Sequence, residues 1–138
     1  MKISAEISRM LMVQDVRERC RMSVLDGIGI MLGAADFAAR NDDRTLKQYL
    51  ETAAPPGPST VLGCDMRTTP LMAAFANGTQ SEALDCQDSN LWIRSHSGTS
   101  AIPTALALAE TGAPQWADIV PAIVAGYEIH ARLLLAVQ

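Results

Sequence analysis

The feature that most restricts the fold is a long apolar stripe at helical spacing near the start of the chain. It lies within residues 14–35 and consists of Val16, Cys20, Val24, Ile28 and Met31, flanked by Leu25 and Leu32. Side chains four positions apart share one face of an α-helix, whereas a strand alternates its faces with a period of two. The stripe therefore predicts a long helix that buries one face.

Similar spacing recurs along most of the remaining sequence. The segments that show it are residues 3–11, 44–52, 70–77, 100–112 and 116–138, while residues 59–63 resemble one short extended segment. Aromatic residues make up only 4% of the chain, a balance that favours close-packed helices over sheets. With 138 residues, we expect a single helical domain over 1–138, an all-α bundle of about five or six helices.

Local signals predict where the helix at residues 70–77 begins and ends. Thr68 or Thr69 precedes Pro70, and a hydroxyl residue before a proline is typical of a helix start. The Asn77-Gly78 pair is typical of a helix end, because both residues tolerate the backbone conformation of a C-terminal cap.

Prolines and glycines also place constraints on three other helices. Thr99 or Ser100 is expected to cap a helix with Pro103 in its first turn. Pro121 is acceptable only in the first turn of the last helix, where its missing N–H has no consequence. Three glycines weaken the first long helix by roughly 1 kcal/mol each, so another helix is expected to pass closely at Gly27, Gly29 and Gly33.

Charge and cysteine usage exclude several classes of function. The net charge is −4 and the Lys and Arg residues are scattered, so nucleic acid is not expected as a partner. Cys20, Cys64 and Cys86 are odd in number and far apart, which predicts neither a disulfide framework nor a CxxC metal site. With no signal peptide and no uncharged run of roughly 20 residues, we expect a soluble, cytoplasmic protein without a membrane partner.

The chemically active side chains are concentrated in residues 77–103, NGTQSEALDCQDSNLWIRSHSGTSAIP. Asp85 and Asp88 are three positions apart, so one helical turn would place both carboxylates on neighbouring faces. With Arg94 and His96 nearby, such carboxylates could act as general acid and base toward an anionic substrate. The alternative is a solvated loop, since polar residues in turns usually cap helices and face water.

Five sequence blocks resemble the helical domain of the MmgE/PrpD family, which includes 2-methylcitrate dehydratase, cis-aconitate decarboxylase and iminodisuccinate epimerase. The blocks are CRMSVLDGIGIMLG at 20–33, STVLGCDMRTTPLMAAFANGT at 59–79, ALDCQDS at 83–89, IPTALALAE at 102–110 and IVAGYEIHARL at 123–133. They follow the family's order with compatible spacing and cover most of the chain. The third block is similar to the family's acidic motif, a leucine followed by an aspartate and then an aspartate pair.

The resemblance implies a lyase or isomerase that acts on small di- and tricarboxylic acids without a cofactor or a metal. Such an enzyme removes a proton beside a carboxylate, and then expels water or carbon dioxide or returns the proton to the other face. A base must reach the acidic carbon, and donors must stabilise the developing negative charge. By the family's pattern, the residues that line the site are Asp85, Ser89 and His96, which we take as the candidate catalytic residues.

The chain departs from the family's pattern in ways that affect substrate binding. Glu82 stands where the family often has His, and Gln87-Asp88 stands where it has an aspartate pair. The added negative charge would repel a polyanion unless Arg94 or Arg67 compensates, so Asp88, Arg94 and Arg67 are the candidate substrate-binding residues. Family members are also longer, with further catalytic His and Lys residues and a second, α/β lid domain.

Two alternative kinds of site are less favoured. Cys86 could be a nucleophile, but it lies between acidic residues, whereas reactive thiols occupy electropositive surroundings. A metal site is not expected either, because no recognised ligand spacing is present among Asp85, Asp88, His96 and His130.

Residues near the C-terminus have structural interpretations. Arg132 could bind a carboxylate of a substrate, or could pair with Glu128 four positions earlier. His130 is expected to be a surface or helix-packing residue, and Trp92 and Trp116 are expected to anchor the packing.

Two functions follow from these observations. The first is a lyase similar to 2-methylcitrate dehydratase, poorly active as this chain alone, with the acidic loop at one end of the bundle. The second is a non-catalytic helical module derived from that family, which dimerises or binds a partner through the apolar final helix. Both predict an oligomer, most simply a homodimer, and only the first predicts a small carboxylic acid as a partner.

Overall fold

The computed structural model describes residues 5–6, 9–10, 14–112 and 114–137. Its elements are α2 (Gln14–Arg40), α3 (Thr45–Ala53), β1 (Pro56–Val61), β2 (Met66–Thr68), α4 (Pro70–Glu82), α5 (Gly98–Ala109) and α6 (Trp116–Val137). The predicted helix at residues 3–11 lies largely outside the described residues. Five of these elements are helices and two are short strands, so the prediction of an all-α bundle is confirmed.

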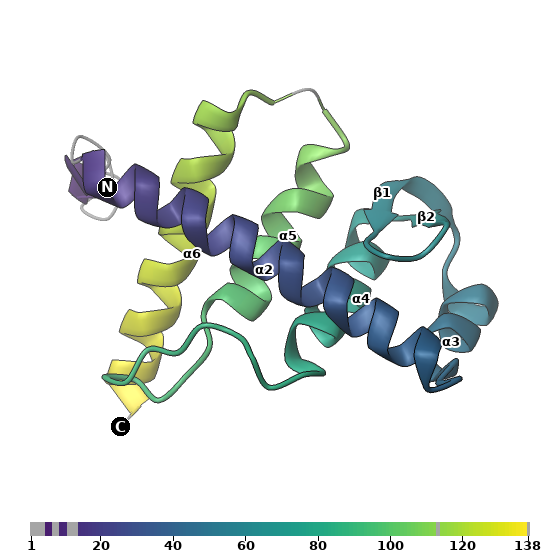
Figure 1. The fold of residues 1–138 in the computed structure, drawn as a ribbon. Coiled ribbons are helices and arrows are strands. Elements are labelled where there is room, and N and C mark those ends of the chain that lie inside the picture. The colour runs from purple at the N-terminus through teal and green to yellow at the C-terminus, as the bar shows by residue number, and fades with distance from the viewer. Residues whose placement is uncertain (1–4, 7–8, 11–13, 113, 138) are drawn as a thin grey trace.

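The helices surround one principal core. Helix α2 crosses the front of the molecule in Figure 1, with α4 and α5 behind it and α6 beside its first half. The residues buried in this core are Cys20, Val24 and Met31 of α2, Ile102 of α5, and Val120, Ile123 and Val124 of α6. The predicted stripe of α2 therefore faces inward, while its flanks Leu25 and Leu32 remain exposed.

A small antiparallel hairpin accompanies the helices. Strands β1 and β2 pair with Thr60 opposite Arg67 and Val61 opposite Met66. The sequence predicted an extended segment at 59–63, which is correct for its first part, but β2 was not predicted. Leu50, Val61 and Ala76 form a second, smaller core between the hairpin and helices α3 and α4.

Helix α4 does not end at Asn77 and Gly78 as the sequence predicted, but continues to Glu82. Asn77 is buried against the hairpin, where its Oδ1 accepts a hydrogen bond from the Leu62 N–H at 2.9 Å. Its Nδ2 donates to the Thr60 carbonyl at 3.0 Å. The side chain therefore satisfies the backbone of another element instead of closing its own helix. The predicted start is correct in position, with Thr69 at the N-cap and Pro70 following it, but the Thr69 hydroxyl makes no capping hydrogen bond.

The start of α5 also differs from the prediction. The helix begins at Gly98, so Thr99 and Ser100 lie inside it. Their hydroxyls donate to the preceding carbonyls of His96 and Ser97, at 2.8 and 3.3 Å, and cap no N–H group.

Both helical prolines lie beyond the first turn, contrary to expectation, at Pro103 inside α5 and Pro121 inside α6. A helical proline cannot donate to the carbonyl four residues earlier. For Pro103 that carbonyl belongs to Thr99, and the Ser81 hydroxyl of α4 approaches it at 3.5 Å. The closely packed helix α4 thus supplies a polar contact for the carbonyl that the proline leaves free.

The glycines of α2 differ in their surroundings. A Cβ added at Gly27 would lie 3.3 Å from the Ile102 side chain of α5, so the predicted close approach of another helix is found there. A Cβ added at Gly29 would meet nothing within 4 Å. Gly29 therefore lies in open space on the outer side of the helix.

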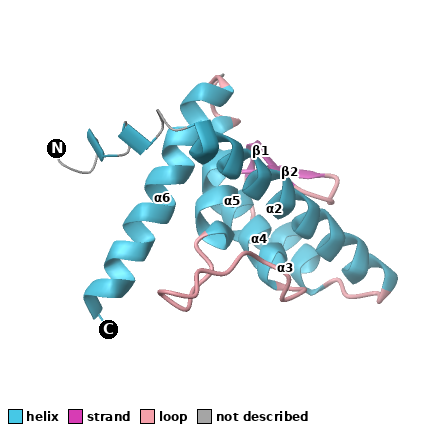
Figure 2. Ribbon diagram, turned by 60° about the vertical axis from the view of Figure 1, so that its left-hand side comes forward, coloured by secondary structure: helices cyan, strands magenta, loops and turns pink. Residues whose placement is uncertain are grey.

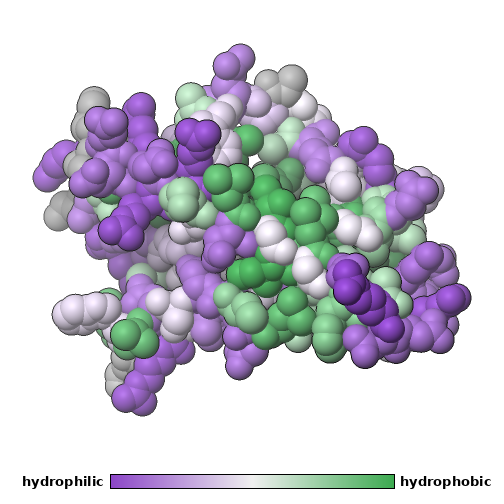
Figure 3. Space-filling view, in the orientation of Figure 1, coloured by the Kyte–Doolittle hydropathy of each residue, from purple (hydrophilic) through white to green (hydrophobic). Residues whose placement is uncertain are grey.

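Much apolar surface of the longest helices is exposed. The residues that share the outer side of α2 include Met22, Leu25 and Leu32, and apolar side chains gather across the middle of this face (Figure 3). By length and composition alone, both α2 and α6 could cross a bilayer, and only 17% of each apolar window is buried. Because the core helices of soluble proteins meet the same criterion, it does not distinguish a membrane protein.

Candidate functional site

The acidic loop, residues 83–97, joins α4 to α5 along one end of the bundle (Figure 2). Asp85 and Arg94 adopt left-handed backbone angles, with φ of 52° and 48°. Such angles are uncommon for residues other than glycine and mark sharp changes of chain direction. Asn90 and Ser95, which lie on either side of Arg94, pair as an isolated antiparallel bridge. The loop is therefore a sequence of turns that its own backbone stabilises.

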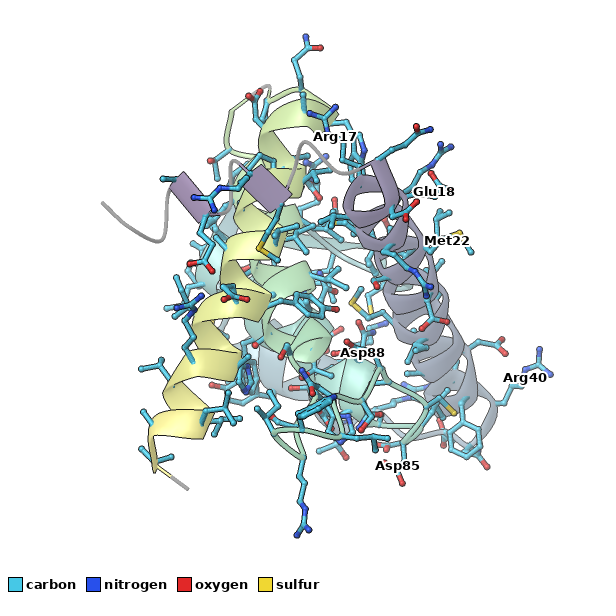
Figure 4. All side chains as sticks on the ribbon, turned by 90° about the vertical axis from the view of Figure 1, so that its left-hand side faces the viewer. Arg17, Glu18, Met22, Arg40, Asp85 and Asp88 are labelled. Carbon is cyan, nitrogen blue, oxygen red and sulfur yellow. The ribbon has the colours of Figure 1, made fainter. Side chains whose placement is uncertain are left out.

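The two aspartates of the motif do not lie on one helical turn, because the chain is not helical between them. Asp85 is exposed and its side chain points away from the bundle, whereas Asp88 is half-buried and lies between the helices (Figure 4). The expectation of two neighbouring carboxylates is therefore wrong. Asp85 has a left-handed backbone angle three residues before the half-buried Asp88.

Both histidines hold the loop in place. Nδ1 of His96 lies 2.6 Å from the backbone carbonyl of Asp88, so this nitrogen carries the proton and donates it. Nε2 of His130 lies 3.0 Å from the Ser95 hydroxyl and connects α6 to the loop. His130 is thus a packing residue, as predicted. Ser89, the third candidate catalytic residue, is exposed and immediately precedes the bridge residue Asn90.

Two of the hollows that the described residues form near the loop have linings without Asp85, Ser89 or His96. The smaller has a volume of about 10 Å³, enough for one water molecule, and is lined by Asp88, Ser23, Asp26 and Ser81 among others. The larger, about 310 Å³, lies between α2 and α6 and is lined mainly by apolar residues. Ser23 lines both hollows, and Asp88 lines the smaller one.

The candidate substrate-binding cations lie on different elements. Arg67 projects from β2, where it pairs with Glu110 at 2.9 Å and also donates to the Pro58 carbonyl. Glu110 accepts from the Thr60 backbone and hydroxyl as well, so this cluster joins the hairpin to the end of α5. Arg94 is exposed at the turn of the acidic loop. Of the two cations, Arg94 is the one on the loop that carries the motif.

Sequence reasoning missed Tyr127 as a neighbour of the site. It lies on α6, and its hydroxyl is buried beside the side chains of Asp88 and Ser23. Burial, and then the negative charge of Asp88, raise the pKa of Tyr127, so the phenol is neutral and can donate a proton in a hydrogen bond. A tyrosine on an apolar helical face is a usable signal, because a buried phenol needs a polar partner.

The other candidates take structural positions. Arg132 pairs with Glu128 at 2.6 Å, as one of the two interpretations predicted, and also with Glu6 at 3.0 Å. Trp92 and Trp116 are 88% and 43% exposed, so the expectation that they anchor the packing is wrong.

Cysteines and metal-binding groups do not form a cluster. Cys86 is exposed, and its thiol donates to the Leu84 carbonyl at 3.2 Å. Burial raises the pKa of the Cys20 and Cys64 thiols, which keeps them in the neutral form. Among the described residues, no three His, Cys, Asp or Glu side chains are placed to hold one metal ion.

Comparison with known proteins assigns the family. Searches of curated proteins and of solved structures find no significant match. The family model described as the MmgE/PrpD N-terminal domain matches residues 5–138, which is nearly the whole chain. The chain therefore belongs to the MmgE/PrpD family and corresponds to its N-terminal, helical part.

Proposed function

We propose that this chain supplies the acidic loop of a cofactor-free lyase or isomerase site for small di- and tricarboxylic acids. The observation that carries the proposal is the position of the family's motif residues. Asp85, Asp88 and Ser89 share one loop of a MmgE/PrpD domain, and His96 ties that loop to itself through the Asp88 carbonyl. A reaction similar to that of 2-methylcitrate dehydratase is the simplest form of this chemistry.

In such an elimination, a base takes the proton from a carbon beside a carboxylate, and a carbon–carbon double bond forms as the neighbouring hydroxyl leaves. The leaving hydroxyl takes up a proton and departs as water. We assign Asp85 to the base or to substrate orientation, and Ser89 and His96 to hydrogen bonds with the substrate. Arg94 would bind a substrate carboxylate in two parallel hydrogen bonds.

The same geometry predicts poor activity for this chain alone. Asp85 is exposed, and neither of the two hollows described above is lined by Asp85 or His96. A site that excludes water strengthens its electrostatic interactions and fixes its donors, and an open loop has neither advantage. We therefore propose that further protein must cover the loop before turnover becomes efficient.

The second candidate is a non-catalytic helical module that dimerises or binds a partner. Exposure of apolar side chains on α2 and α6 favours it, since 17% of each apolar window is buried in the chain by itself. Large exposed apolar patches commonly mark protein–protein interfaces. For this candidate, the most direct partner is a second copy of the chain in the cytoplasm.

A proton-exchange assay separates the two candidates. The chain is incubated in D₂O with 2-methylcitrate or cis-aconitate, and deuterium incorporation and product are followed by NMR. Slow exchange that is lost in Asp85→Asn, but kept in the control Asp65→Asn in an exposed turn, would support the lyase. Deuterium exchange no faster than in buffer without protein, together with a stable dimer in analytical ultracentrifugation, would instead support the non-catalytic module.

A further inference from the structure

Three elements meet closely at Gly98, the first residue of α5. A Cβ added there would overlap the Asp88 carboxylate of the loop and would lie 2.5 Å from the Tyr127 hydroxyl of α6. Gly98 is itself buried. The absence of a side chain at this position therefore lets the carboxylate and the phenol approach each other over the start of the helix.

The Tyr127 hydroxyl has few possible partners at this junction. Asp88 and Ser23 are the polar side chains that interact with it. Within the described part of the chain, no partner meets the distance and angle criteria for a hydrogen bond with this buried hydroxyl. The Asp88 carboxylate nevertheless lies next to it. A buried phenol beside a carboxylate gains most by donating its proton to that carboxylate, because bonds to charged acceptors are the stronger ones.

Asp88 is also the residue through which His96 is held. Its carboxylate faces Tyr127, while its backbone carbonyl lies 2.6 Å from Nδ1 of His96. The side chain thus connects the loop to α6, and the main chain connects it to the histidine of the motif. A displacement of Asp88 would move both contacts together.

We propose that Tyr127 is a positioning residue: its hydroxyl holds the Asp88 carboxylate inside the bundle and thereby fixes the orientation of His96. The inference rests on the proposed function only in treating Asp88 and His96 as residues of the site. Gly98 contributes by leaving room for the contact, and Ser23 borders the same hydroxyl from α2.

The first test compares Tyr127→Phe with Tyr49→Phe in the full chain, since the sequence contains two tyrosines. Tyr49 is half-exposed and packs edge-on against Phe75, far in sequence from the loop. If the proposed Tyr127–Asp88 hydrogen bond forms, its loss in Tyr127→Phe should accelerate hydrogen exchange of the loop amides roughly five- to tenfold. Exchange in α4 should change little, and Tyr49→Phe should leave the loop at the wild-type rate.

A second test uses a signal that loss of packing alone would not move. In Asp88→Asn, removal of the negative charge should lower the midpoint at which Tyr127 ionises, followed by ultraviolet absorbance of the phenolate. In Tyr127→Phe, Tyr49 is the remaining tyrosine, so its titration can be measured alone and subtracted from that of the wild type to give the Tyr127 curve. The NMR signals of the His96 ring should shift in both Tyr127→Phe and Asp88→Asn.

An unchanged Tyr127 midpoint in Asp88→Asn, or loop exchange in Tyr127→Phe equal to that of Tyr49→Phe, would overturn the inference. Neither measurement requires turnover. A failure of the proposed enzymatic function would therefore leave this result unaffected, and a failure here would not decide that function.

Discussion

The Gln87 side-chain amide donates a hydrogen bond to the Glu82 carboxylate, with 2.8 Å between Nε2 and Oε2. Both positions differ from the family's pattern by the resemblance described above, and here their side chains are in direct contact. An aspartate at position 87 would bring a second carboxylate toward Glu82, whereas the neutral amide offers a donor. The amide therefore stabilises the Glu82 carboxylate by donating a hydrogen bond to it.

The hydrogen bond between Gln87 and Glu82 predicts that substitutions at the two positions depend on each other. Gln87→Asp alone should lower the free energy of unfolding by about 1 kcal/mol, because it replaces a donor with a like charge beside Glu82. The same change in a Glu82→His background should cost less, because the new residues can attract each other. Urea unfolding of the four proteins measures the coupling, and strictly additive effects would argue against the pairing.

Gly98→Ala should destabilise the fold, because the added methyl group overlaps the Asp88 carboxylate and crowds the Tyr127 hydroxyl. Overpacking of this kind typically costs about 1–3 kcal/mol. Gly29→Ala is the matched control, since its Cβ would meet nothing within 4 Å. The control should stabilise α2 by about 0.5–1 kcal/mol. Thermal unfolding of both variants tests this difference in stability. Equal changes in Tm with the same sign would contradict the prediction.

Asn77→Ala should be strongly destabilising, because it leaves the Leu62 N–H and the Thr60 carbonyl without their partners. Each buried group left unsatisfied costs about 1–3 kcal/mol. Asn41→Ala removes a hydrogen bond to the Phe37 carbonyl at an exposed position and should cost much less. Chemical denaturation gives both values. Similar losses for the two variants would show that the hairpin does not depend on Asn77.

The raised pKa of Tyr127 predicts a loss of stability in alkaline solution. The free phenol ionises near pH 10.0, and the folded protein resists this ionisation, so the unfolded chain loses its proton first. The contribution of Tyr127 is therefore complete below that pH and declines as the pH rises above it. The free energy of unfolding should fall more steeply between about pH 10 and 11 in the wild type than in Tyr127→Phe. If the free energies of unfolding of the wild type and Tyr127→Phe changed in parallel with pH, the prediction would be contradicted.

The helices were predictable because their signal is local. Stripes such as Cys20, Val24 and Met31 specify a buried face whatever surrounds it, and the structure places these three in the core. The end of α4 was not predictable, because the bonds of Asn77 reach a hairpin whose second strand has only three residues. The role of the Asn77 side chain is set by its tertiary contacts with Leu62 and Thr60, whereas the local Asn77-Gly78 pair indicated a helix end.

The candidate site shows the same division. The sequence motif brought together Asp85, Asp88 and His96 on one loop, but a left-handed turn at Asp85 separates the two carboxylates. Periodicity cannot reveal such a turn in a residue other than glycine. Tyr127 was missed because its contact with Asp88 crosses from α6 to the loop, and no pattern along the chain records that approach.

The central claim is that the acidic loop of this MmgE/PrpD domain is where a small organic acid binds. Titration of isotope-labelled protein with 2-methylcitrate or cis-aconitate, followed by amide chemical shifts, tests it most directly. We expect saturable shifts at residues 83–97 that disappear in Asp85→Asn and persist in Asp65→Asn. Shifts confined to other elements, or no shift at millimolar acid, would contradict it.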